Sequence, residues 1–140
     1  MRRLLLFTAF LLTLIGSTDL VAQTSDSWTL YRELDAVKIE YTTQQCGNDV
    51  ITEFNFIKLT NKTAQPVSIT FKIEYYYNGS CTTCSIEEYR FTFSLPSNGS
   101  IEADCSLSPN TGRLAIIKRY VNRNYGHPLD RFELSDIVVH

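Results

Sequence analysis

The sequence contains few of the residue types from which most catalytic and metal centres are built. Its 140 residues include only two histidines, one tryptophan, one methionine and four cysteines. No serine lies in a nucleophile-elbow motif, and no glycine-rich segment has the pattern of a phosphate-binding loop. We therefore expect a protein that is not an enzyme and that holds no cofactor and no metal ion.

The sequence also lacks an excess of charge and a long apolar segment. Lysine and arginine (13 residues) against aspartate and glutamate (15 residues) leave a net charge of −2. This balance fits neither a basic nucleic-acid-binding protein nor an acidic tail. No segment has the roughly 20 apolar residues that cross a bilayer as a helix. No nucleic-acid partner and no transmembrane segment are expected, and 44% hydrophobic residues predict one packed domain.

The longest apolar run, residues 4–15, follows Arg2 and Arg3 at the start of the chain. A positive start followed by an apolar core of this length is typical of a secretory signal peptide. Cleavage after Ala22 fits the small residue that is required at such a site. We therefore expect residues 1–22 to be a signal peptide that directs the chain to the periplasm, the cell surface or the medium. A buried first helix is the alternative.

Strict alternation of apolar and polar residues dominates the mature chain and predicts strands. The clearest case lies between Pro66 and Tyr77, where the odd-numbered positions are apolar or aromatic. The phase of the alternation changes within residues 51–60, which indicates a bulge or a strand covered on both faces. A second phase slip occurs near Ser135 and Asp136. The other predicted strands are 37–43, 89–95, 101–104, 114–117 (continuously apolar, as in a central strand) and 132–139.

Seven strands separated by turn residues predict an all-β fold, an antiparallel β-sandwich of about seven strands. Residues 23–33 are expected to form an irregular lead-in or a short helix, and residues 34–140 the sandwich. The segment FNFIKLTNKTAQPVSITFKIEYYYNG (residues 54–79) resembles small exported bacterial proteins with an immunoglobulin-like or fibronectin-III-like sandwich. This resemblance implies an immunoglobulin-like architecture and carries no biochemical activity with it. Trp28 precedes all four cysteines, so the tryptophan that immunoglobulin domains place between their cysteines is absent.

The even number of cysteines in an exported chain predicts two disulfides among Cys46, Cys81, Cys84 and Cys105. If successive strands alternate in direction, all four cysteines lie at the same end of the sandwich. The expected pairing is Cys46–Cys81 with Cys84–Cys105. The alternative is Cys46–Cys105 with Cys81–Cys84.

The spacing of Cys81 and Cys84 also matches that of thiol-redox proteins. A redox-active pair needs a helix N-terminus to lower the pKa of its thiol, and these cysteines lie in a predicted turn between strands. A four-cysteine zinc site needs a second pair at the same spacing, and the chain has none. We therefore expect structural disulfides and keep a thiol-redox protein as the alternative.

Exposed aromatic and basic residues are the candidates for ligand contact. Tyr76 stands on the polar face of its predicted strand, and residues 113–131 hold five basic residues against one acidic residue. The loop around residues 122–128 and the cysteine-containing end are the expected recognition surfaces. His127 and His140 are expected at opposite ends of the sandwich, which argues against a paired histidine site. The speculative ligand-binding residues are Tyr76, Arg119, Arg123, Tyr125 and His127.

These features predict an exported, non-enzymatic binding or structural module of the cell surface or periplasm, whose partner is an unknown protein or glycan. A carbohydrate-binding module that uses Tyr76 and Tyr125 is one alternative, and a thiol-redox protein is the other. Asn61, Asn78 and Asn98 each begin an N-glycosylation sequon within a predicted turn.

Overall fold

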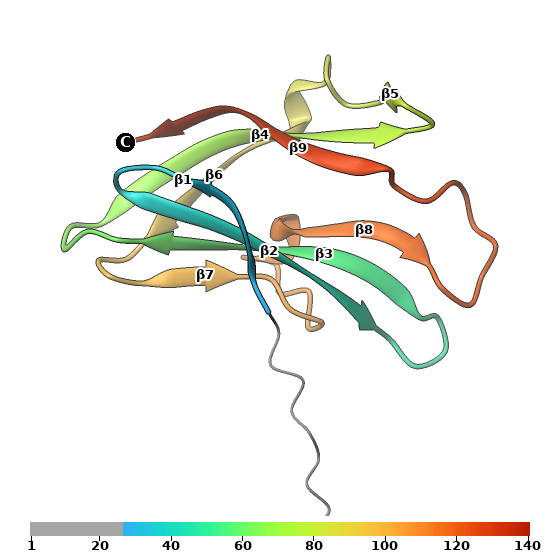
Figure 1. Cartoon of the computed structure of the whole chain (residues 1–140). Coiled ribbons are helices and arrows are strands. Elements are labelled where there is room, and N and C mark those ends of the chain that lie inside the picture. Colours follow the sequence, from blue (N-terminus) through green and yellow to red (C-terminus); the bar gives the residue numbers. More distant parts are fainter. Residues whose placement is uncertain (1–26) are drawn as a thin grey trace, which may run out of the picture.

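The computed structural model describes residues 27–140, which form two antiparallel β-sheets packed face to face (Figure 1). The predicted all-β, antiparallel class is confirmed. The predicted signal peptide, residues 1–22, lies outside the described residues. Within the described part of the chain, no helix is long and apolar enough to cross a membrane.

The first sheet is built around β3 (Thr52–Asn61). One edge of β3 pairs along its whole length with β2 (Val37–Cys46), which in turn pairs with β1 (Thr29–Glu33). The other edge is shared by two short strands. β7 (Ser100–Glu102) pairs with the end of β3, and β8 (Ala115–Tyr120) pairs with its beginning.

The second sheet is built around β4 (Val67–Tyr77), with β9 (Arg131–Val139) on one edge. The other edge pairs first with β6 (Arg90–Leu95) and, at the end of β4, with the two-residue β5 (Ser80–Cys81). Two 3₁₀ turns complete the described elements: η1 (Glu87–Tyr89) before β6 and η2 (Gly112–Leu114) before β8.

The core lies between the two sheets and follows the predicted alternation of β4. Ile69, Phe71 and Ile73 are completely buried, as the odd-numbered positions were expected to be. Ile39 and Leu59 oppose them from the first sheet and are equally buried. The core therefore forms where the two strict period-two patterns meet.

β3 is buried on both faces, which explains the phase change predicted for residues 51–60. Its pairing with β2 is unbroken, so alternation places Ile57 and Leu59 on one face and Phe54 and Phe56 on the other. All four side chains are buried, and the two phenylalanine rings stack with centroids 5.5 Å apart. Cys46 shares the phenylalanine face by register, so its disulfide holds the segment after β7 over that face.

Two further details of the strands differ from the prediction. Residues 29–33 were expected within an irregular lead-in, but they form β1. The register of β1 with β2 shifts between Leu30 and Arg32, so the sequence of β1 does not show a regular alternation of apolar and polar residues. The run Leu114–Ile117 was expected as a central strand, but β8 is an edge strand that pairs only with β3 among the described strands. Leu114 belongs to η2, and Ile117 is 42% exposed.

The slip expected near residues 135–136 is confirmed as an irregularity of β9. Its partners on β4 shift between Thr70 and Lys72, and Asp136 takes a positive φ of 50°. A shift of this kind absorbs an extra residue and lets both halves of the strand keep their apolar side chains inward.

The disulfides join Cys46 to Cys105 and Cys81 to Cys84, so the expected pairing was wrong and the alternative is correct. The expected pairing assumed that all cysteines at one end of the sandwich can reach one another. Cys46 instead belongs to the outer face of the first sheet, whereas Cys81 and Cys84 close one turn of the second sheet.

Asn61 links two turns at the opposite end of the sandwich from β5. Its side chain is 1% exposed, and Nδ2 donates to the carbonyl oxygens of Gln65 (2.8 Å) and Pro96 (2.9 Å). Its Oδ1 accepts from the backbone N–H and the hydroxyl of Thr63. All hydrogen-bonding positions of this buried amide are therefore used within the fold.

The three N-glycosylation sequons differ in whether the amide of their asparagine is accessible in the folded protein. In a host that glycosylates secreted chains, we expect glycans at the exposed Asn78 and Asn98 but none at Asn61 of the folded protein, because both hydrogens of its Nδ2 are engaged. Peptide mass spectrometry of the secreted, folded fraction measures the occupancy. A glycan at Asn61 in protein with native unfolding behaviour would contradict the assignment.

Candidate functional site

A groove lies where β8 of the first sheet approaches the β4–β5 hairpin of the second sheet. Figure 1 shows β5 and β8 in different layers at the same end of the molecule. Two hollows of about 450 Å³ and about 440 Å³ adjoin there and share Tyr77, Thr82 and Ile117. We call them together the tyrosine groove. The tyrosines that line it are Tyr75, Tyr77, Tyr89, Tyr120 and Tyr125.

One wall of the tyrosine groove is the edge of β8. Residues 115–117 line one hollow, and residues 117–120 line the other. Successive side chains of a strand point to opposite faces, so an unbroken run of lining residues means that the backbone edge itself faces the groove. Near its end this edge is occupied, because the backbone N–H of Leu129 donates to the carbonyl oxygen of Lys118 over 2.8 Å.

The opposite wall is fixed by hydrogen bonds of the hairpin. Thr83 is buried, donates its hydroxyl to the carbonyl of Ile73 (3.1 Å) and accepts from the N–H of Tyr75 (2.9 Å). The Tyr75 ring packs edge-on against Tyr89 at 5.2 Å. Burial, aided by neighbouring phenols, raises the pKa of Tyr75 to about 12 and also raises the pKa of Tyr77. Both phenols are therefore uncharged at neutral pH.

The third wall comes from the loop between β8 and β9. Tyr125 is 61% exposed and packs edge-on against Tyr120, with centroids 5.5 Å apart. The loop is anchored by Asn122, whose side chain accepts from the N–H of Ile51 and donates to the carbonyl of Asp49. This wall therefore presents the aromatic ring of Tyr125 on a loop that the hydrogen bonds of Asn122 hold in place.

Positive charge exceeds negative charge at the loop end of the groove. Lys118 and Arg119 both pair with the same carboxylate, that of Glu53, and Lys118 Nζ is 3.6 Å from it. Among the residues that the structure describes, no aspartate or glutamate lines either hollow. Two cations share one anion there, and the exposed imidazole of His127 also lines this end of the groove.

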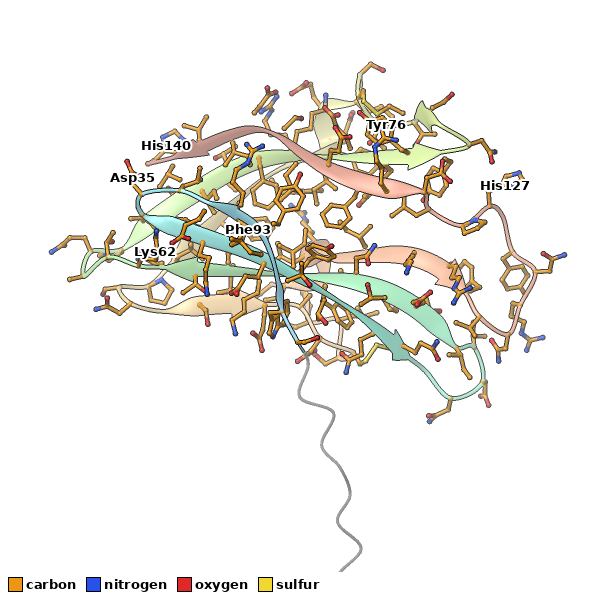
Figure 2. All side chains as sticks on the ribbon, in the orientation of Figure 1. Asp35, Lys62, Tyr76, Phe93, His127 and His140 are labelled. Carbon is orange, nitrogen blue, oxygen red and sulfur yellow. A yellow bond between two sulfur atoms is a disulfide. The ribbon has the colours of Figure 1, made fainter. Side chains whose placement is uncertain are left out.

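The structure brings three of the five predicted ligand-binding residues together. Arg119, Tyr125 and His127 all line the groove. Arg123 lies in the same loop but does not line either hollow. Figure 2 labels His127 and His140 at opposite ends of the molecule, as predicted.

Tyr76 lies away from the groove, on the outer face of the second sheet (Figure 2). The guanidinium of Arg131 covers its ring at 3.7 Å, and its hydroxyl donates to Glu74 (3.1 Å). This hydroxyl is also 3.4 Å from a carboxylate oxygen of Glu133. One face of the ring therefore packs against the guanidinium of Arg131, and the hydroxyl is hydrogen-bonded within the sheet.

Sequence reasoning missed Tyr77, Tyr120 and Ile117. Tyr77 is one of the odd-numbered positions of β4, and these positions were expected to pack in the core. At the end of β4 the same phase faces the groove, because the opposing edge strand β8 leaves an opening there. The available signal was the position of Tyr77 immediately before the Asn-Gly turn.

The Cys81–Cys84 pair has the surroundings of a structural disulfide. The carboxylate of Glu74 lies 3.2 Å from Cys84 Sγ, and a negative charge at this distance would disfavour a thiolate there after reduction. The ammonium of the buried Lys72 donates to the carbonyl of Cys84 over 2.5 Å and holds the turn in place. Glu74 and the two sulfurs lie within 4.8 Å of one another, but disulfide sulfurs are not thiolate ligands for a metal.

No protein-family model, curated protein sequence or solved structure matches this chain.

Proposed function

We propose that the chain is an exported, non-enzymatic binding module that takes its ligand in the tyrosine groove. The immunoglobulin-like architecture and the cleaved signal peptide predicted from the sequence are part of this proposal. The two disulfides support export, because such bonds persist mainly in oxidising compartments.

The tyrosine groove is the observation that carries the proposal. Its walls come from a hydrogen-bonded hairpin, a sheet edge and an anchored loop, so the surface is formed before a ligand arrives. Tyrosine offers a large apolar ring and one polar group at a low cost in side-chain entropy, which suits it to recognition. The lining residues include no pair of carboxylates and no nucleophile beside a histidine.

The two alternatives have less support. A carbohydrate-binding module would use coplanar exposed rings, but Tyr120 and Tyr125 are inclined by 85° and Tyr76 is covered by Arg131. A thiol-redox protein would need a stabilised thiolate, and the carboxylate of Glu74 opposes one at Cys84. Reduction of insulin by the purified protein would test the second alternative directly.

Replacing Tyr125 by serine should weaken ligand binding about tenfold or more, because this side chain supplies the exposed aromatic wall. The measurement screens the disulfide-intact protein against a displayed library of random peptides and against a glycan array. Leu30→Ser is the matched control, since Leu30 is 54% exposed and lies outside the groove. Ligands that bind Tyr125→Ser and wild type equally would show that recognition lies elsewhere.

A further inference from the structure

We infer that the ligand of the tyrosine groove is an extended peptide with acidic side chains, which pairs with the free edge of β8. This inference rests on the proposed function and names the ligand class. The peptide would add one strand to the first sheet beyond β8, alongside residues 115–117.

The backbone of β8 supplies the first argument. Alternate residues of a strand direct their N–H and C=O groups to opposite edges. Among residues 27–140, β3 pairs with one edge of β8 and no strand pairs with the other edge. The chemistry that matches an unpaired edge is the backbone of another extended chain. Pairing would end at Lys118, because its carbonyl already accepts from Leu129 and the register with β3 shifts beside it.

Three of the other edge strands are interrupted or covered, whereas the register shift of β8 lies beyond residues 115–117. β1 is short and has a register shift, and β9 has the irregularity at Asp136. Beside β6, the guanidinium of Arg113 lies 5.1 Å from the centre of the Phe91 ring. β8 instead exposes Ile117 and opens onto a groove. Bulges, short strands and covering groups are the usual means of blocking edge pairing.

The two hollows supply the side-chain argument. Side chains at positions i and i+2 of a strand point the same way and are about 7 Å apart. Two adjoining hollows along β8 that share Ile117 suit such a pair. The hollow that includes Tyr75, Ile86 and Tyr89 offers aromatic and aliphatic surface to one of these side chains.

The charges select an acidic peptide over a basic one. The second hollow contains Lys118, Arg119 and His127, and no carboxylate from residues 27–140 lines it. Glu53 balances only one of the two cations. A glutamate or aspartate two residues from the apolar anchor would lie at this positive end.

The test uses a displayed library of random nine-residue peptides, selected on the disulfide-intact protein and counter-selected on Tyr125→Ser. The expected result is enrichment of aspartate and glutamate at positions that alternate with apolar residues.

The strongest binder is then synthesised in two forms, one N-methylated at its odd-numbered positions and one at its even-numbered positions. One form should lose about tenfold or more in affinity and the other less than about threefold, because only one set of amides faces β8.

Two results would overturn the inference. One is equal loss, or no loss, in both N-methylated forms, since strand addition uses one edge of the peptide only. The other is a library from which no peptide distinguishes wild type from Tyr125→Ser. A glycan-array ligand whose binding depends on Tyr125 would leave the binding function standing and exclude the peptide, so the two failures can be told apart.

Discussion

Replacing Cys46 and Cys105 together by alanine should lower the free energy of unfolding by about 4 kcal/mol. Replacing Cys81 and Cys84 should lower it by only about 2 kcal/mol. The sequence separations are 59 and 3 residues, and a longer closed loop removes more entropy from the unfolded chain. The first disulfide thus supplies most of the stabilisation expected from cross-linking.

The position of the Cys46–Cys105 bond adds to this difference. It joins the end of β2 to the segment after β7, on the face of β3 that carries Phe54 and Phe56. Loss of the bond frees this segment to leave two buried aromatic rings. Urea unfolding of the wild type and both double variants measures the three free energies. Equal losses in the two variants would contradict the loop-length argument.

Asn61→Ala should lower the free energy of unfolding by about 3 kcal/mol, because several buried partners then lose their hydrogen bonds. The carbonyls of Gln65 and Pro96 lose their donor, and the N–H of Thr63 loses its acceptor. Asn61 is only 1% exposed, so these groups have no bulk solvent beside them to replace the amide.

The matched control is Asn98→Gly in the neighbouring turn. Asn98 is exposed and has a φ of 52°, a conformation that glycine adopts without strain, so its stability should change by less than about 1 kcal/mol. Thermal and urea unfolding measure both variants. An Asn61→Ala protein as stable as the control would show that the buried amide is not a structural link.

The core could be predicted from the sequence because it depends on local periodicity. The odd-numbered positions of β4 alternate without interruption, and Ile69, Phe71 and Ile73 are buried as expected. The slip in β9 was visible for the same reason: a change of phase in the sequence corresponds to a change of register at Asp136.

Features that depend on which strands become neighbours could not be predicted in this way. A continuous apolar run is found in central strands, but Leu114–Ile117 is apolar for two other reasons: Leu114 fills the core from η2, and Ile117 faces a groove. The disulfide pairing required knowledge of the face on which Cys46 lies, and that face is set by the register of β2 with β3.

The groove itself needed three segments to meet. Tyr77, Ile117 and Tyr125 come from the hairpin, the edge strand and the last loop, and Tyr77 is distant in the sequence from the other two. Tyr76 was predicted as a ligand contact because it lies among the polar positions of its strand, and its side chain does face outward. Sequence alone did not show that Arg131 of the adjacent strand would cover its ring.

The short spacing of Cys81 and Cys84 has a consequence for the order of events during biosynthesis. The chain is synthesised from its N-terminus, so Cys81 and Cys84 become available to Cys46 before Cys105 does. Oxidation at that stage would join Cys46 to Cys81 or to Cys84. The ring between Cys81 and Cys84 spans only 3 residues, so it can close locally without any other part of the fold. Once closed, it removes both competitors and leaves Cys105 as the remaining partner for Cys46. The disulfide that contributes less to stability therefore protects the correct formation of the one that contributes more.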